Sequence, residues 1–199
     1  MARTIGSDGE RTEAAMREAA LRLIARHGYE AVSMRKLADE VGVQAAALYR
    51  YFPTKEDLLF TLMREHMETL IASWSEFSPP DADPRDQLAV FVRNHIAFHL
   101  ARRSSTHVNN LELRSLSPER LTRIVALRES YEKELRAILQ RGADARIFDV
   151  EDPALVSMAI IQMITGIIVW FRPDERLTAE ELTDRYLTMT LRLAGAGTT

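Results

Sequence analysis

The stretch of residues 33–55, SMRKLADEVGVQAAALYRYFPTK, constrains the fold of this chain more than any other. Its apolar spacing predicts one short helix over about residues 34–40 and a second over about residues 45–51. Gly42 lies between the two, where a tight turn needs a residue that tolerates a positive φ. A short second helix held against the first is the geometry of a helix-turn-helix that reads DNA. The residues left facing outward are Gln44, Ala45, Ala46, Tyr49 and Arg50.

The charge balance means that any contact with nucleic acid must be local. The formal net charge is -3 at pH 7, and residues 1–66 hold ten Lys/Arg against ten Asp/Glu. A generally basic domain is therefore excluded. Helix N-termini attract anions independently of net charge, and Ser33 and Lys55 each stand at the start of an expected helix. We expect these two helix ends to bind phosphates.

Enzyme chemistry finds no support in the sequence. The chain has no cysteine, so it has no disulfide, no thiolate zinc site and no cysteine nucleophile. The GxSxG and HExxH motifs and a phosphate-binding glycine loop are absent too. The pair Glu180 and Glu181 stands at a helix start, where capping explains it. His95 and His99 have a spacing found in helical metal sites, but without an acidic neighbour we interpret them as lining a core or a ligand pocket.

One uncharged run, residues 153–171, approaches the length of a membrane span. Its polar members, among them Ser157 and Gln162, favour a buried helix at an interface instead. The N-terminal residues lack the apolar segment of a secretion signal. We therefore expect a protein of the reducing cytoplasm that has no membrane partner.

The remaining pattern predicts an all-α protein of about nine helices, without a strand. Residues 1–9 look like a flexible tail, and residues 10–57 are expected to form a three-helix DNA-binding domain. Residues 58–199 are expected to form a second helical domain. Inside it, the prolines and turn formers of residues 78–84 end one long helix and open the next.

Residues 32–59 carry a set of residues at fixed spacing: Ser33, Arg35, Leu37, Ala38, Val41, Gly42, Val43, Leu48, Tyr49, Arg50, Tyr51, Phe52, Lys55 and Glu56. In these residues the stretch resembles the DNA-binding domain of the TetR family of bacterial repressors. The resemblance implies an obligate homodimer with an N-terminal DNA reader and a C-terminal domain that binds a small molecule. Residues 95–136 are similar to the branch of that family that regulates fatty-acid and steroid breakdown and senses acyl-CoA thioesters.

Each outward side chain of the reader has an expected role, with a solvated surface residue as the alternative. Tyr49 is expected to bind phosphates together with the two helix ends. Arg35 and Gln44 can donate to base edges in the major groove. Where members of the family often carry lysine, serine or glycine, this chain has Ala45 and Ala46. An alanine cannot hydrogen-bond a base; it can only pack on a thymine methyl or let the protein backbone come close to the DNA. We therefore expect few directly read bases and a large contribution from DNA shape.

The second domain offers candidates for an effector site and a dimer face. Helical phase predicts a pocket that mixes apolar area with a few polar groups. An arginine at its end could meet the phosphates of a CoA-type ligand, with a solvated helix end as an equally good alternative. No other cofactor is expected. The pocket residues are Phe91, His95, Phe98, His99, Asn109, Tyr131, Gln162 and Trp170, with Arg102 as the arginine. The last two helices are the expected dimer face, through Ile160, Ile161, Ile164, Ile167, Ile168, Leu187 and Leu191.

Two functions of different classes compete. The first is a repressor. Its dimer would place two DNA-reading helices about 34 Å apart on a near-palindromic operator, and a hydrophobic ligand, such as an acyl-CoA thioester, would release it from the DNA. The helix over residues 54–77, opened by the capping pair Thr54 and Asp57, would be the only continuous link between domains and hence the lever. The second is a helical carrier of small molecules or lipids without DNA function. Sequence-selective, salt-dependent DNA binding distinguishes them.

Overall fold

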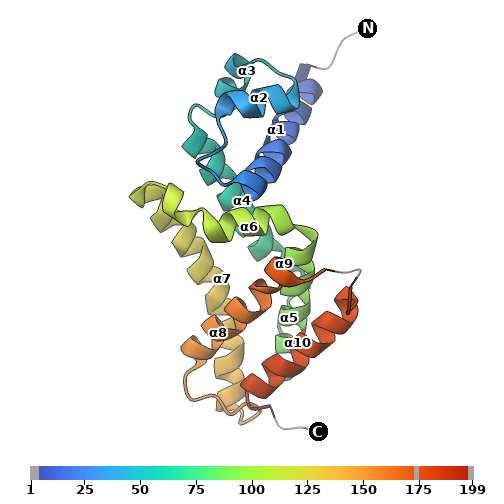
Figure 1. Cartoon of the computed structure of the whole chain (residues 1–199). Helices are drawn as coiled ribbons and strands as arrows, with labels where there is room; N and C mark the ends of the chain where they lie inside the picture. Colours follow the sequence, from blue (N-terminus) through green and yellow to red (C-terminus); the bar gives the residue numbers. More distant parts are fainter. Residues whose placement is uncertain (1–4, 173–174, 197–199) are drawn as a thin grey trace. The chain divides into compact units, whose positions relative to one another are not determined.

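The computed structural model describes residues 5–172 and 175–196, and every regular element in them is a helix (Figure 1). If the single turn α9 is counted as the continuation of α8, these residues contain nine α-helices and no strand, which confirms the all-α prediction. The elements are α1 (Ile5–His27), α2 (Met34–Val41), α3 (Ala45–Tyr51), α4 (Lys55–Phe77), α5 (Pro84–Ala101), α6 (Arg103–Leu111), the 3-10 turn η1 (Leu113–Ser115), α7 (Pro118–Asp144), α8 (Pro153–Thr165), α9 (Ile167–Trp170) and α10 (Ala179–Leu193).

The first helix begins earlier than the sequence suggested. Residues 5–9, predicted as part of a flexible tail, form the first turns of α1, whereas residues 1–4 of that tail lie outside the described part of the chain. Adding turns to an existing helix costs little once it has nucleated. The Tyr51 hydroxyl also donates a hydrogen bond to the carbonyl oxygen of Gly9 at 3.3 Å, which holds this end of the helix.

The chain forms two compact units that do not follow a single break in the sequence. The first unit consists of the described residues up to His66 together with Ser104–Ile124. The second consists of Met67–Arg103 together with the described residues from Val125 onward. These bounds differ from the predicted domain boundary at residue 57, because α6, η1 and the first turns of α7 pack with the N-terminal helices.

The expectation that α4 is the only continuous link between the two parts is wrong. Helix α7 also begins in the first unit and continues into the second, and the chain crosses between the units again at Arg103. Local periodicity gave no sign of this, because it does not reveal which distant segments pack together.

The first unit closes around a small apolar core. Helix α1 contributes Met16, Ala20 and Ile24, which are spaced four apart and therefore share one face. Leu37 of α2 and Leu48 of α3 are buried to 1% exposure or less, so both short helices are anchored through one side. The opposite sides of α2 and α3 are left to solvent.

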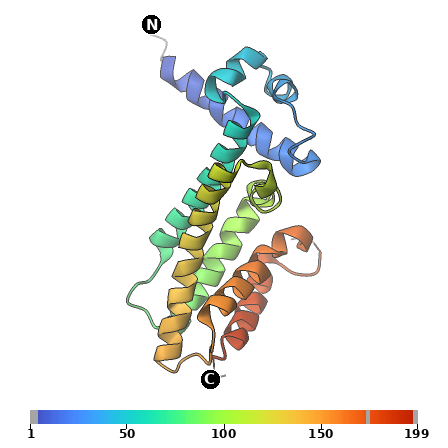
Figure 2. The same cartoon turned by 90° about the vertical axis from the view of Figure 1, so that its left-hand side faces the viewer.

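The second unit is a helical bundle with α5 at its centre. Helix α5 packs against α8, α9 and α10, as Figures 1 and 2 show. The buried residues of α5 are mostly apolar but include His95 and His99, and the Phe91 and His95 rings stack on Tyr131 of α7. The fully buried members of this core include Leu88, Phe91, Val92, Ile96, Leu135, Ile138, Leu139, Ile160 and Ile164.

The apolar helices α8 and α9 bury a different side from the one expected. Ile160, Ile164, Ile167 and Ile168, predicted on the dimer face, are buried in the core of the second unit. The reason is that a helix without charged residues has no polar stripe to mark its outer side. The exposed large apolar residues on α8, α9 and α10 are Leu155, Met158, Val169, Trp170, Met189 and Leu193. Within the described residues, Pro153–Trp170 is also the one stretch whose length and hydropathy would suit a membrane span, with 28% of it buried in this chain.

Candidate functional site

Helix α2 is capped at both ends, and its C-terminal cap forms the turn to α3. Ser33 caps α2, where its hydroxyl accepts a hydrogen bond from the Lys36 amide at 3.1 Å. Gly42 ends α2 in the left-handed region, with φ of 73° and ψ of 30°, and the Val43 amide donates to the Ala38 carbonyl at 3.0 Å. A Cβ built on Gly42 would meet nothing within 4 Å. The backbone angle, and not a lack of space, is therefore what requires glycine.

The outward face of the turn and α3 agrees with the sequence interpretation. Gln44 is the N-cap residue of α3, and its side chain makes no capping hydrogen bond. Tyr49 is 48% exposed, and Arg50 and Ala46 are exposed as well. Ala45 is half-buried and so stands closer to the core than expected.

Two further predicted contact residues differ from each other in their surroundings. Arg35 is exposed on α2. Lys55 is half-buried at the start of α4: its Nζ donates to the Tyr29 carbonyl oxygen at 3.0 Å and lies 3.9 Å from the centre of the Tyr29 ring. The expected phosphate-binding ammonium is thus already held by the loop after α1. Two of its three N–H groups are not used by this contact.

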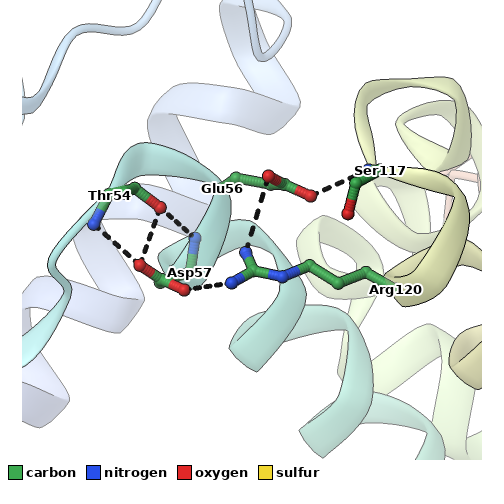
Figure 3. A network of polar contacts seen from close by, with 5 residues as sticks. All are labelled: Thr54, Glu56, Asp57, Ser117 and Arg120. Carbon is green, nitrogen blue, oxygen red and sulfur yellow. Dashed lines mark hydrogen bonds and ion pairs between the residues drawn. The ribbon is translucent and has the colours of Figure 1, made fainter.

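The first turn of α4 is held from two directions, as Figure 3 shows. On one side, Thr54 and Asp57 form the predicted reciprocal cap, because the Asp57 carboxylate accepts from the Thr54 amide at 2.8 Å and the Asp57 amide donates to the Thr54 hydroxyl at 3.0 Å. On the other side, the Glu56 carboxylate accepts from the Ser117 amide at 2.8 Å. Arg120 of α7 donates to the Asp57 carboxylate, and its guanidinium lies 3.8 Å from Glu56.

These contacts keep both carboxylates ionised. The hydrogen bond from the Ser117 amide lowers the pKa of Glu56 below its ordinary value, with Arg120 contributing in the same direction. The Thr54 hydroxyl and then Arg120 lower the pKa of Asp57. Sequence reasoning found the cap but missed Ser117 and Arg120, which lie more than sixty residues further along the chain and leave no local pattern.

Several predicted pocket residues meet in the core of the second unit. His95 is bonded on both sides, with Nδ1 3.1 Å from the Tyr131 hydroxyl and Nε2 2.9 Å from the Thr165 hydroxyl. Its ring stacks on that of His99, with centroids 4.0 Å apart, and the Phe91 ring stacks on Tyr131 at 5.1 Å. Thr165 was not foreseen.

Burial favours the neutral form of His99. His99 Nδ1 donates to the His95 carbonyl oxygen at 2.8 Å, and burial lowers the pKa of His99 to about 4. Burial likewise raises the pKa of Tyr131. No group of three metal-ligating side chains occurs among the residues that the structure describes.

Phe98 contacts the cluster through the His99 ring, with centroids 5.5 Å apart, whereas Asn109, Gln162 and Trp170 are not part of it. Asn109 is buried in the first unit, where its amide donates to the Ser105 carbonyl at 3.2 Å. Gln162 is exposed, and Trp170 is 48% exposed with its ring 6.4 Å from that of Tyr186. Helical phase failed here because the stretch around residue 165 changes from α8 to α9 and has no polar side to orient it.

Two surface hollows border the second unit. One of about 430 Å³ lies along α4 and α5 and includes Phe98 and Arg102, whose guanidinium carbon is 4.3 Å from the Phe98 ring centre. The other, about 480 Å³, is lined on α10 and the segment before it by three arginines, with Trp170 beside them. Arg102 is exposed, so the predicted arginine at the end of the pocket lies at the first hollow and outside the buried cluster.

The comparisons with known proteins agree with this architecture. Residues 17–62 match the family model described as bacterial regulatory proteins, tetR family. Residues 81–194 match the model described as tetracyclin repressor-like, C-terminal domain, which alone spans more than half of the chain.

Individual relatives align over nearly the whole length. The fatty acid metabolism regulator protein of Bacillus subtilis (strain 168) is 29% identical over 84% of this chain and 82% of its own. A regulatory protein in the tetR family from Rhodococcus RHA1 has a TM-score of 0.90 and 29% identity, covering 94% of this chain and 98% of that one. AibR, solved in complex with isovaleryl coenzyme A and operator DNA, has a TM-score of 0.80 and 27% identity, covering 94% of this chain and 100% of that one.

Proposed function

The chain belongs to the TetR family of bacterial regulatory proteins, and on this premise we propose that it is a dimeric repressor that a small hydrophobic ligand releases from its operator. Members of this family are DNA-binding transcriptional regulators and not enzymes. The observation that carries the proposal is the solvent-facing side of the turn and α3. Gln44, Tyr49 and Arg50 are exposed there, while the opposite side of the two short helices is buried in the core of the first unit.

The proposed reader uses α3 in the major groove and helix ends on the backbone. Ser33, Tyr49 and the remaining N–H groups of Lys55 bind phosphates, while Arg35, Gln44 and Arg50 face the groove. Ala45 and Ala46 give close packing without hydrogen bonds to bases. The protein would therefore recognise its operator partly through the shape of the DNA.

The proposed homodimer forms through α8, α9 and α10. Val169 is 70% exposed, Leu155 59% and Met158 52%, so α8 and α9 present an apolar stripe to solvent. Met189 and Leu193 are exposed on α10 as well. Exposed apolar surface of this kind is typical of association surfaces. A second copy that covers the stripe would set two readers on one near-palindromic operator.

The proposed effector is an acyl-CoA thioester, and the protein acts in the cytoplasm. Support comes from AibR, whose structure holds isovaleryl coenzyme A, and from the relative named as a regulator of fatty acid metabolism. The second unit offers a core with hydrogen-bonding groups at His95, Tyr131 and Thr165. Arg102, just after α5, lines the hollow along α4 and α5. To move the protein from almost fully bound to almost fully released, the ligand must prefer the released state by about 5.5 kcal/mol.

Two measurements test the proposal. Fluorescence anisotropy with duplexes from the region of its own gene should show tight, sequence-selective binding that weakens with salt. A thermal-shift screen of acyl-CoAs beside free fatty acids and steroids should show stabilisation by the effector class. Ligand stabilisation without any selective DNA binding would favour the alternative, a helical carrier.

A further inference from the structure

We infer that Arg120 of α7 is a positioning residue for DNA reading: by holding the first turn of α4, it fixes where α3 and Lys55 stand. This inference rests on the proposed DNA binding. It concerns a residue outside the predicted contact set, in a segment 63 residues beyond its partner Asp57, and all the contacts involved lie within the first unit.

The link between α3 and α4 is short and stiff. Helix α3 ends at Tyr51 and α4 begins at Lys55, so only Phe52, Pro53 and Thr54 separate them. Phe52 is 3% exposed and its amide donates to the Leu48 carbonyl at 3.0 Å, while the next residue is a proline with a fixed φ. A rotation of the first turn of α4 is therefore transmitted to α3.

Arg120 contacts this turn at the residue that also caps it. Asp57 accepts from the backbone of Thr54 with one side of its carboxylate and from Arg120 with the other. Glu56 lies 3.8 Å from the same guanidinium and accepts from the Ser117 amide, so two successive carboxylates of α4 are joined to the start of α7 (Figure 3). The Arg120 side chain is 25% exposed, which makes these contacts stronger than those of solvated ion pairs.

The segment just before α7 makes a second contact that also leads to the start of α4. The Glu112 carboxylate, just after α6, accepts from the Tyr29 amide at 3.1 Å and from the Ser115 hydroxyl at 3.1 Å. Tyr29 in turn holds the Lys55 ammonium through its carbonyl oxygen and its ring. The segment from Glu112 to Arg120 thus holds Lys55 indirectly, through Tyr29, and holds the first turn of α4 directly, through Asp57.

Arg123 supplies a matched control. It lies one helical turn beyond Arg120 on α7, and its guanidinium carbon is 5.2 Å from the Phe60 ring centre, compared with 5.4 Å for Arg120. Within the described chain it has no ion pair with the α4 carboxylates. Arg123→Gln therefore removes the same charge from the same helix and the same aromatic contact, but leaves the contact with Asp57 in place.

The experiment compares operator affinity among Arg120→Gln, Arg120→Lys, Asp57→Asn, Arg123→Gln and the double variant Arg120→Gln with Asp57→Asn. Affinity is measured by anisotropy well below each melting temperature, with the active fraction fixed by stoichiometric titration. Arg120→Gln should weaken binding about tenfold, since hydrogen bonds to charged groups contribute at this level. Arg120→Lys should recover most of the loss, and the double variant should bind no more weakly than the single ones.

Several outcomes separate this inference from the proposed function. If the wild-type protein selects a DNA sequence but Arg120→Gln and Asp57→Asn bind it with wild-type affinity, the inference is wrong and the proposed function stands. Equal losses of operator affinity in Arg123→Gln and Arg120→Gln would also overturn it, because the effect would then come from removing a positive charge on α7 and not from the contact with Asp57. If Arg120→Gln fails to fold, Glu56→Gln and Asp57→Asn carry the test. Absence of selective binding by the wild-type protein would overturn the proposed function itself.

Discussion

The Lys55 ammonium donates to the Tyr29 carbonyl oxygen at 3.0 Å and lies 3.9 Å from the centre of the Tyr29 ring. The lysine that sequence analysis assigned to DNA phosphates is thus oriented before any DNA arrives. A pre-oriented cation loses less side-chain entropy on binding than a solvated one. We therefore propose that Lys55 both binds DNA phosphates and takes part in the packing that holds the start of α4.

Replacing Lys55 by methionine keeps most of the apolar stem and removes the charge. We expect weaker binding to every DNA sequence by a similar factor, and a slope of log affinity against log salt reduced by about one. Anisotropy titrations over a salt series measure both. Lys133→Met, an exposed change on α7 in the second unit, makes the same charge change and should leave the slope as it is. An unchanged slope in Lys55→Met would remove this residue from the phosphate contacts.

Gly42 should tolerate asparagine better than alanine. Its φ of 73° is strained for most side chains, while the space around it is open. Gly42→Ala should cost about 1–2 kcal/mol in the free energy of unfolding, and Gly42→Asn clearly less, because asparagine adopts the left-handed region more readily. Urea unfolding measures both. Equal costs would mean that the turn depends on something other than this backbone angle.

Burial of neutral His99 should make the protein sensitive to mild acid. The folded pKa is about 4, compared with 6.5 as the ordinary value, so between these limits the unfolded chain binds more protons than the folded one. The stabilising contribution is complete above about pH 6.5 and falls as the pH drops towards 4, by about 3 kcal/mol in total. His99→Gln should flatten this part of the stability profile relative to wild type, whereas His27→Gln, at an exposed site, should not. Parallel profiles for wild type and His99→Gln would contradict the assignment.

The proposed dimer depends on the exposed stripe of α8 and α9. Val169→Glu places a charge where two copies would meet, and like charges brought together at an interface cost several kcal/mol. Analytical ultracentrifugation should find a monomer for this variant and a dimer for wild type. Val125→Glu, a partly exposed valine on α7, is the matched control and should remain a dimer. A dimeric Val169→Glu protein would place the association surface elsewhere.

The sequence was most informative where one short segment decides its own structure. The helix start at Ser33, the turn at Gly42 and the reciprocal pair of Thr54 and Asp57 were all predicted, because each joins residues within a few positions of one another. Arg120 escaped, since its pairing with Asp57 depends on how α7 packs in the first unit. The burial of Ile160 escaped for a different reason: a helix without charges gives no sign of which side faces the core.

The most direct measurement of the central claim, that the turn and α3 read DNA, is selection of bound duplexes from a genomic-fragment library, followed by anisotropy at two salt concentrations. We expect enrichment of a near-palindromic sequence, affinity that falls steeply with salt, and marked loss of binding in Tyr49→Ala, with smaller losses in Ala45→Gly and Ala46→Gly. Failure to enrich any sequence, or an enriched sequence that Tyr49→Ala and both glycine variants bind as tightly as wild type, would contradict it.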